Sequence, residues 1–328
     1  MRTIDKLFLT LIIPVFNEGS NIERLILRLS PIVENLKVQY EILFIDDGSS
    51  DDTLGSIKQF AASNPHIRAI SFSRNFGKDI AIAAGLENTK GNAAILMDAD
   101  LQHPPEMIEI FVAKWLEGYD MVYGQRIDRA SDGHIRRALT HSFYHLFERF
   151  GEVKLPDGAG DFRLLDRKVI DVIRQMPERA RFSKGLYAWV GFKSVGVPFE
   201  VAHRAAGLSK WNFRKLFRFA FDGITSFSSA PLKVWTFIGV IVSAIAFIYA
   251  LIVIFKTLVF GTDVPGFPSL IVSVMMLSGI QLMSLGILGE YISRIFAEVK
   301  RRPLYVVAEV VEGEPSKHDI VSLQNQIK

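Results

Sequence analysis

The stretch AAILMDADLQHPPEMIEIF, residues 93–111, ends an apolar run at two aspartates and then begins a helical pattern with prolines in its first turn. A short apolar run that ends in this way is typical of a buried strand. Side chains two residues apart lie on the same side of an extended chain, so Asp98 and Asp100 share one face. Proline is favoured in the first turn of a helix. The stretch therefore predicts a strand and a following helix, in a sheet whose two faces are both covered by helices.

The same alternation extends over the first 126 residues. Strand-like runs occupy 7–16, 40–49, 67–73, 93–100 and 120–126, and helical patterns occupy 20–36, 51–63, 77–89 and 104–118. Strands that alternate with helices predict βαβ units, a mostly parallel sheet and an α/β fold.

Polar residues follow each of these five strands. In open parallel sheets, ligands bind at the carboxyl ends of the strands. One polar residue at a strand end is ordinary loop composition, but five consecutive ends predict a ligand site. The residues at these ends are Asn17, Glu18, Asp46, Asp47, Arg74, Asn75, Asp98, Asp100, Gln125 and Arg126.

The expected ligand carries phosphate, but the usual phosphate loops are missing from the sequence. It contains neither a glycine-rich dinucleotide fingerprint nor a G-x-x-x-x-G-K-[ST] loop. A divalent cation bound by carboxylates is the expected substitute, because Mg²⁺ typically takes one or two carboxylates together with substrate phosphate oxygens.

Composition excludes several other classes of function. The 328 residues include no cysteine, which rules out disulfides, a thiolate nucleophile and a cysteine-ligated metal. The formal net charge of +3 is too small to indicate nucleic-acid binding, so no nucleic-acid partner is expected.

Two uncharged apolar runs, 234–255 and 269–289, predict two transmembrane helices, each long enough to cross a hydrocarbon core of about 30 Å. Buried core helices are the alternative interpretation. The basic segments lie before the first run and after the second, which predicts a multi-pass protein of the inner (plasma) membrane with both large flanks in the cytoplasm. Just before the first run, 213–224 carries an apolar stripe beside basic residues, as amphipathic interfacial helices do.

These features divide the chain into four parts. Residues 1–210 form the expected cytoplasmic catalytic domain, 211–232 the interfacial amphipathic region, 233–290 the two transmembrane helices with a short external loop, and 291–328 a cytoplasmic tail. In the tail, 302–315 alternates apolar and polar residues, which predicts a strand that adds to another sheet edge or to another subunit. A homo-oligomer is expected on that basis.

Four motifs carry a family resemblance. LIIPVFNE (11–18), ILFIDDGSSDDT (42–53), SRNFGKDIAIAAGL (73–86) and MDADLQHPPE (97–106) resemble the successive nucleotide-sugar motifs of family 2 glycosyltransferases, which have the GT-A fold. GAGDFRLLDR (158–167) and HRAAGLSKW (203–211) narrow the resemblance to polyprenyl-phosphate glycosyltransferases, such as dolichyl-phosphate mannose synthases, bactoprenol glucosyltransferases and undecaprenyl-phosphate aminoarabinose transferases. The segment 286–307 is similar to their two-span bacterial branch, which is a second reason to expect a homo-oligomer.

The resemblance implies a nucleotide and metal site. It assigns Asp98 and Asp100 to Mg²⁺ or Mn²⁺ and the nucleotide, with the second aspartate on the diphosphate and the first near the ribose. Gln102 and His103 are possible outer ligands, with helix entry an equal alternative for His103. The resemblance places Glu18, and Asp46 or Asp47, around the uracil and ribose, and Pro14 and Asn17 are further expected nucleotide-binding residues. Lys78 follows the third strand, where a cation could reach the base or the diphosphate; a plain surface lysine is the alternative.

Catalysis and acceptor binding are implied for other residues. Asp157 and Asp161 lie in 155–170, where glycines suggest a loop beside the sugar; either could act as base or orienting residue. A lipid monophosphate is already mostly ionised at neutral pH, so the need for a strong base is small. Arginine and lysine suit phosphate, and the expected acceptor-phosphate residues are Arg126, Arg204 and Lys210.

The expected function is metal-dependent transfer of a sugar from a nucleotide sugar to polyprenyl phosphate in the lipid bilayer. The resemblance implies inversion and a UDP-sugar donor such as UDP-glucose. A processive polysaccharide synthase is one alternative, although the Q-x-x-R-W motif is missing and two spans are few for a channel. The others are a non-catalytic sugar-lipid carrier or flippase component and a membrane-tethered nucleotide sensor. The sequence does not identify the sugar.

Overall fold

The computed structural model describes residues 2–126, 158–176, 178–179, 181–200, 230–260 and 266–314. The expected interfacial helix at 213–224 lies outside these residues.

An eight-stranded sheet forms the centre of the α/β domain, in the order β7-β5-β6-β4-β1-β2-β3-β8. Its middle strands β4, β1, β2 and β3 are parallel, as the alternating pattern predicts. The strands are β1 Phe8–Val15, β2 Gln39–Asp46, β3 Ile67–Phe72, β4 Ala93–Leu96, β5 Met121–Arg126, β6 Ala159–Asp166, β7 Ser194–Phe199 and β8 Val307–Val311.

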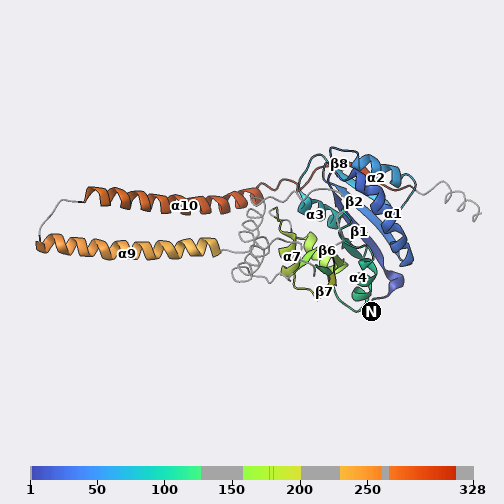
Figure 1. Ribbon diagram of the computed structural model, residues 1–328, viewed down its shortest axis with the longest axis horizontal. Helices are drawn as coiled ribbons and strands as arrows, with labels where there is room; N and C mark the ends of the chain where they lie inside the picture. The colour runs from blue at the N-terminus through green and yellow to red at the C-terminus, as the bar shows by residue number, and fades with distance from the viewer. Residues whose placement is uncertain are drawn as a thin grey trace, which may run out of the picture.

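Helices cover both faces of this sheet (Figure 1). Leu11 and Ile13 of β1 pack into the core under α1, α2 and α4, whereas Ile12 between them packs into the core under α3, α6 and α7. Burying each such side chain stabilises the fold by about 1.5–3 kcal/mol, which explains the unbroken apolar run. The helices are η1 Ile4–Lys6, α1 Gly19–Asn35, α2 Thr53–Ala61, α3 Lys78–Asn88, α4 Met107–Leu116, α6 Arg167–Arg174, α7 Ser183–Trp189, α9 Ala230–Phe260 and α10 Phe267–Val299.

The segment expected to form a loop beside the sugar is largely a strand. β6 lies between β4 and β5 and pairs antiparallel with both, which makes the sheet mixed. Phe162 and Leu164 enter one core and Leu165 enters the other, so β6 is buried on both faces. Asp161 and Arg163 interrupt the apolar pattern of β6, so the sequence does not predict this strand.

The predicted strand of the tail is confirmed as β8, which pairs antiparallel with β3 of the same chain. The strand therefore extends its own sheet, and it gives no reason to expect a second subunit.

Two long helices, α9 and α10, extend away from the α/β domain side by side (Figure 1). Among the described residues, one segment, Ser273–Val299 of α10, is long and apolar enough to cross a membrane, and none of its most apolar stretch is buried. The other predicted span, 234–255, lies within the continuous helix α9. The two-span topology stays a prediction.

Candidate active site

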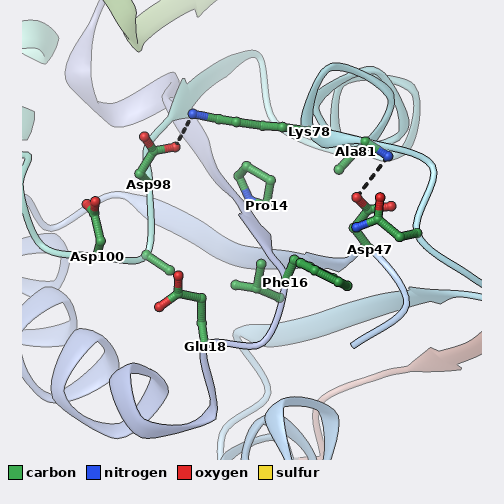
Figure 2. Close-up of a pocket in the computed structure, with 12 residues that line it drawn as sticks. Pro14, Phe16, Glu18, Asp47, Lys78, Ala81, Asp98 and Asp100 are labelled. Atoms are coloured by element: carbon green, nitrogen blue, oxygen red, sulfur yellow. Dashed lines mark hydrogen bonds and ion pairs between the residues drawn. The ribbon is translucent and has the colours of Figure 1, made fainter. Parts of the chain in front are cut away.

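The sheet has a topological switch point between β1 and β4. The chain continues from β1 to β2 and β3 on one side, and then returns to place β4 on the other side of β1. Loops that leave two such strands diverge and open a crevice at the strands' carboxyl ends. A cavity of about 320 Å³ lies there, lined by Pro14, Val15, Phe16, Glu18, Asp47, Asn75, Gly77, Lys78, Ala81, Asp98, Ala99 and Asp100 (Figure 2).

Most of the predicted nucleotide-binding residues meet at this cavity. Those in its lining are Pro14, Glu18, Asp47, Lys78, Asp98 and Asp100. Asn17 and Asp46 lie outside the lining. The five loops that the sequence places at one sheet edge therefore contribute unequally to the cavity lining.

The structure distinguishes the adjacent aspartates at the end of β2. Asp46 is 1% exposed, and its two oxygens accept hydrogen bonds from the Ser49 amide (3.0 Å) and the Ser71 hydroxyl (2.7 Å). Asp47 turns the other way: its oxygens accept from the amides of Phe76 (2.6 Å) and Gly77 (2.9 Å). Burial raises the pKa of Asp47 although these bonds act against the shift. Asp46 therefore fixes the turn, and Asp47 ties the next loop to the cavity wall.

The loops after β1, β2 and β3 are bonded to one another. Asn17 has φ 55°, and its backbone amide donates to the Ser49 hydroxyl (2.9 Å). Its side-chain oxygen accepts a hydrogen bond from the Ser50 backbone amide (2.8 Å). Gly48, with φ +67°, approaches Arg74 so closely that a Cβ atom would lie 2.4 Å from the Arg74 carbonyl carbon. The side chain of Asn17 thus serves as a brace between loops.

A lysine bridges two carboxylates at the cavity. The Lys78 ammonium lies 2.6 Å from an oxygen of Asp98 and 3.1 Å from an oxygen of Asp161 on β6, and Figure 2 shows it reaching across to Asp98. Burial lowers the pKa of Lys78, but the charges of Asp98 and Asp161 outweigh it and raise the pKa above its ordinary value. Burial raises the pKa of Asp161, but Lys78 and Lys184 outweigh it and hold the pKa well below its usual range. Lys78 and Asp161 are therefore both charged at neutral pH.

The loop that carries Asp98 and Asp100 rests on His103. The Asp98 amide donates to Nδ1 of His103 (3.3 Å), whose ring stacks on Phe162 with centroids 4.7 Å apart. Burial lowers the pKa of His103, which fits a neutral ring with Nδ1 as acceptor. Asp100 accepts from the Gln102 amide (3.1 Å). His103 therefore supports the loop from the core side.

A charged cluster behind the cavity was not foreseen from the sequence. Asp79 of α3 accepts from the hydroxyl and amide of Ser183 in α7. Arg163 of β6 is 5% exposed, and its guanidinium lies 3.8 Å from the centre of the Tyr187 ring. The cluster fixes β6, and with it Asp161, against α3 and α7. Its signal in the sequence is weak: polar residues at alternate positions of an apolar segment.

The remaining predicted residues lie elsewhere. Asp157, Arg204 and Lys210 lie outside the described residues. Arg126 ends β5, and its amide donates to the Gly158 carbonyl (3.2 Å), away from the cavity lining.

The acidic pair Asp98 and Asp100 is the candidate metal site of this cavity. Within the described parts of the chain, no group of three or more histidine or acidic side chains is arranged to hold an ion. Asp98 and Asp100 nevertheless line the same cavity. A pair of carboxylates fits a cation such as Mg²⁺ when phosphate oxygens of a substrate complete its coordination.

Comparison with known proteins agrees with this geometry. Residues 10–174 match the family model for glycosyl transferase family 2. An uncharacterized glycosyltransferase, sll0501, of Synechocystis sp. is 48% identical over 92% of this chain and 95% of its own length. The SfII prophage-derived bactoprenol glucosyl transferase of Shigella flexneri is 44% identical over 94% of this chain and 99% of its own. The crystal structure of mannosyl-3-phosphoglycerate synthase from Rubrobacter xylanophilus is 18% identical over 67% of this chain and 72% of that one, with a TM-score of 0.47.

The chain belongs to glycosyl transferase family 2 and is a glycosyltransferase with a mixed α/β GT-A fold.

Proposed function

We propose that this enzyme transfers a sugar from a nucleotide sugar to a polyprenyl phosphate at the cytoplasmic face of the membrane. The observation that carries the proposal is the acidic cavity at the switch point, where Glu18, Asp98 and Asp100 meet. Near-full-length relatives named bactoprenol glucosyl transferase support a lipid-phosphate acceptor. The apolar helix α10 supports a site close to the bilayer.

The proposed donor is a UDP-sugar such as UDP-glucose. In the proposal, Asp98 and Asp100 hold Mg²⁺ or Mn²⁺, which supplies Lewis-acid charge for the departing diphosphate. Glu18, Pro14 and Asp47 form the side of the cavity proposed for the nucleoside. Lys78 lies between the acidic pair and β6, where its positive charge favours binding of a diphosphate.

The two candidate bases differ in their suitability. An efficient general base has a pKa near the working pH. Lys78 keeps the pKa of Asp161 far below that range, so we assign Asp161 to orienting Lys78. Asp157 then stays the proposed base or orienting residue, and the ionised lipid phosphate attacks the sugar carbon with inversion. Arg126, Arg204 and Lys210 are the proposed contacts of that phosphate.

The test is a transfer assay with the purified full chain, polyprenyl phosphate, Mg²⁺ and a panel of radiolabelled nucleotide sugars. We expect label in the lipid fraction from one donor, its loss in EDTA, and a fall of at least 100-fold with Asp100→Asn. Asp171→Asn, on the exposed outer side of α6, is the control and should match the unaltered chain.

The assay also separates the alternatives. A processive synthase would give labelled polymer, and a nucleotide sensor would bind a donor without turnover. If no donor in the panel labels the lipid, although the folded protein binds nucleotide, the proposed reaction is wrong. Sugar transfer that continues in EDTA would contradict only the proposed metal dependence and leave the proposed reaction in place.

A further inference from the structure

The segment that follows α10 connects this helix to the cavity. Residues 300–311, here called the C-terminal strap, end in β8, which pairs with β3 through Phe72 and Val307. Beyond the end of β3, the Ser73 amide donates to the Val306 carbonyl (2.9 Å). Figure 1 shows β8 at the edge of the sheet, with α10 at the other end of the strap. The strap therefore touches the chain where it leaves β3 for the cavity.

Tyr305 is the main anchor of the strap. Its ring stacks on Phe72, with centroids 4.8 Å apart and planes 22° from parallel. Its hydroxyl donates to Glu87 (2.8 Å) and accepts from the Asn88 side chain (3.3 Å), both at the end of α3. Burial and the bond to Glu87 raise the pKa of Tyr305 to about 12, so the hydroxyl stays protonated at neutral pH. Tyr305 is thus held by β3 and α3, the two elements that flank residues 73–77, here called the cavity loop.

The contacts continue from Tyr305 to the cavity wall. Phe72 meets Phe76 edge to face, with centroids 5.7 Å apart. The amides of Phe76 and Gly77 are the two donors to Asp47, which lines the cavity. Tyr305 is therefore linked to Phe76 by two aromatic contacts, and the Phe76 amide donates to the carboxylate of Asp47.

The cavity loop opens to the cavity at Gly77 and contacts the strap at Ser73. Gly77 has φ +106°, and apart from its chain neighbours no residue has an atom within 4 Å of the place where its Cβ would be, which agrees with its position in the cavity lining. Core packing alone would account for the ring of Tyr305 on Phe72. The bond from the Ser73 amide to the Val306 carbonyl continues the antiparallel β3–β8 pairing by one residue, so the strap also contacts the first residue of the cavity loop.

We propose that Tyr305 is a positioning residue of the donor cavity. Through Phe72 and Phe76 it holds the cavity loop in the arrangement in which Asp47 is capped and Lys78 begins α3. The end of α10 is thereby coupled to donor binding. That the bound ligand is a nucleotide rests on the proposed function; the coupling itself does not.

Two measurements on the full chain in detergent test the coupling. The first is amide hydrogen exchange of the cavity loop without ligand, and the second is the affinity for UDP with MgCl₂ by calorimetry. We expect Tyr305→Ala to speed exchange at Phe76 and Gly77 and to weaken UDP binding, each by about tenfold. Tyr305→Phe keeps the ring stack and should lie close to the unaltered chain. Glu312→Ala, just after the strap, removes an exposed partner of Arg68 and should change neither quantity.

A variant with the same loss of stability tests whether Tyr305 has a purely structural role. Ile173→Ala removes a side chain from the same core at α6, away from the strap. If it affects the loop and UDP binding as much as Tyr305→Ala does at an equal loss of melting temperature, the proposal is overturned. Should Tyr305→Ala fail to fold, Tyr305→Leu takes its place. A loop that exchanges at the unaltered rate also overturns the proposal, whereas a chain that never binds UDP but shows the faster exchange overturns only the nucleotide assignment.

Discussion

Lys78 is the residue whose removal should disturb the cavity most directly. Without its ammonium, Asp98 and Asp161 lose the cation they share. We expect Lys78→Met to lower kcat/KM for the donor by at least tenfold, about 1.4 kcal/mol of transition-state stabilisation. Initial rates at varied donor concentration measure this.

The matched control is Lys114→Met, which removes a lysine that pairs with Glu117 on the outside of α4. It should leave kcat/KM unchanged. Equal rates for the Lys78 variant and the unaltered enzyme would show that the bridge has no role in transfer.

His103 lends itself to a prediction about metal affinity. In His103→Phe the ring can still stack on Phe162, but the partly buried Asp98 amide loses its acceptor, which costs about 1 kcal/mol. The loop with both aspartates should loosen, so the metal concentration for half-maximal activity should rise several-fold. The rate at saturating metal should change little. A metal titration of activity checks this, and an unchanged midpoint would remove His103 from the support of the loop.

At the scale of single residues, the sequence predicted positions but not partners. Asp98 and Asp100 could be recognised because they directly follow an apolar strand. Asp46 and Asp47 could not be distinguished, because adjacent residues point to opposite sides and the sequence does not say which side is open. The contact of Lys78 with Asp161 could not be predicted from the sequence, because it depends on the position of β6 in the sheet.

At the scale of elements, an ionic cluster fastens the start of the chain to the far side of the domain. Arg2 lies 2.6 Å from Asp120 and 2.8 Å from Asp166, and Lys168 lies 2.7 Å from Asp120. Burial raises the pKa of Asp120, but Lys168 and Arg2 outweigh it and hold the pKa below its ordinary value. A carboxyl with a lowered pKa stabilises the fold above its unfolded pKa and loses that contribution as the pH falls.

Asp120→Asn should therefore destabilise the protein at pH 7 by about 1–2 kcal/mol, because Lys168 is half exposed and its share is screened. The difference from the unaltered chain should narrow as the pH falls below about 4, where the carboxyl of the unfolded chain is protonated. Thermal unfolding at pH 7, 5 and 3.5 measures it. A gap that stays constant with pH would exclude the charge as its origin.

The elements themselves were predictable to different degrees. The five strands from β1 to β5 follow apolar runs and were all found. β6 was missed because its strand character comes from burial between β4 and β5 rather than from its own composition. The alternation in β8 was visible, but its partner, β3, could be known only from the folded sheet.

At the scale of the whole molecule, the catalytic domain is attached to α10 at more than one point. Glu298, near the end of α10, accepts from the Arg179 amide (2.7 Å), and the strap continues to the sheet edge. This attachment joins the tail to its own domain, and the expected homo-oligomer stays a prediction. The attachment also fixes the direction in which α10 leaves the domain, which makes the topology of the two long helices testable.

The last prediction concerns that topology. If α9 and α10 both cross the membrane, the connection at 261–265 faces outward and the strap faces the cytoplasm. The chain has no cysteine, so a single introduced cysteine is a clean probe. In intact cells, a membrane-impermeant maleimide should label Thr262→Cys, whereas Glu309→Cys on β8 should react only after the cells are opened. Each variant should retain transfer activity. Protection of Thr262→Cys in intact cells, together with reaction in opened cells, would show that the helices do not cross, because the connection would then lie on the same side as the catalytic domain.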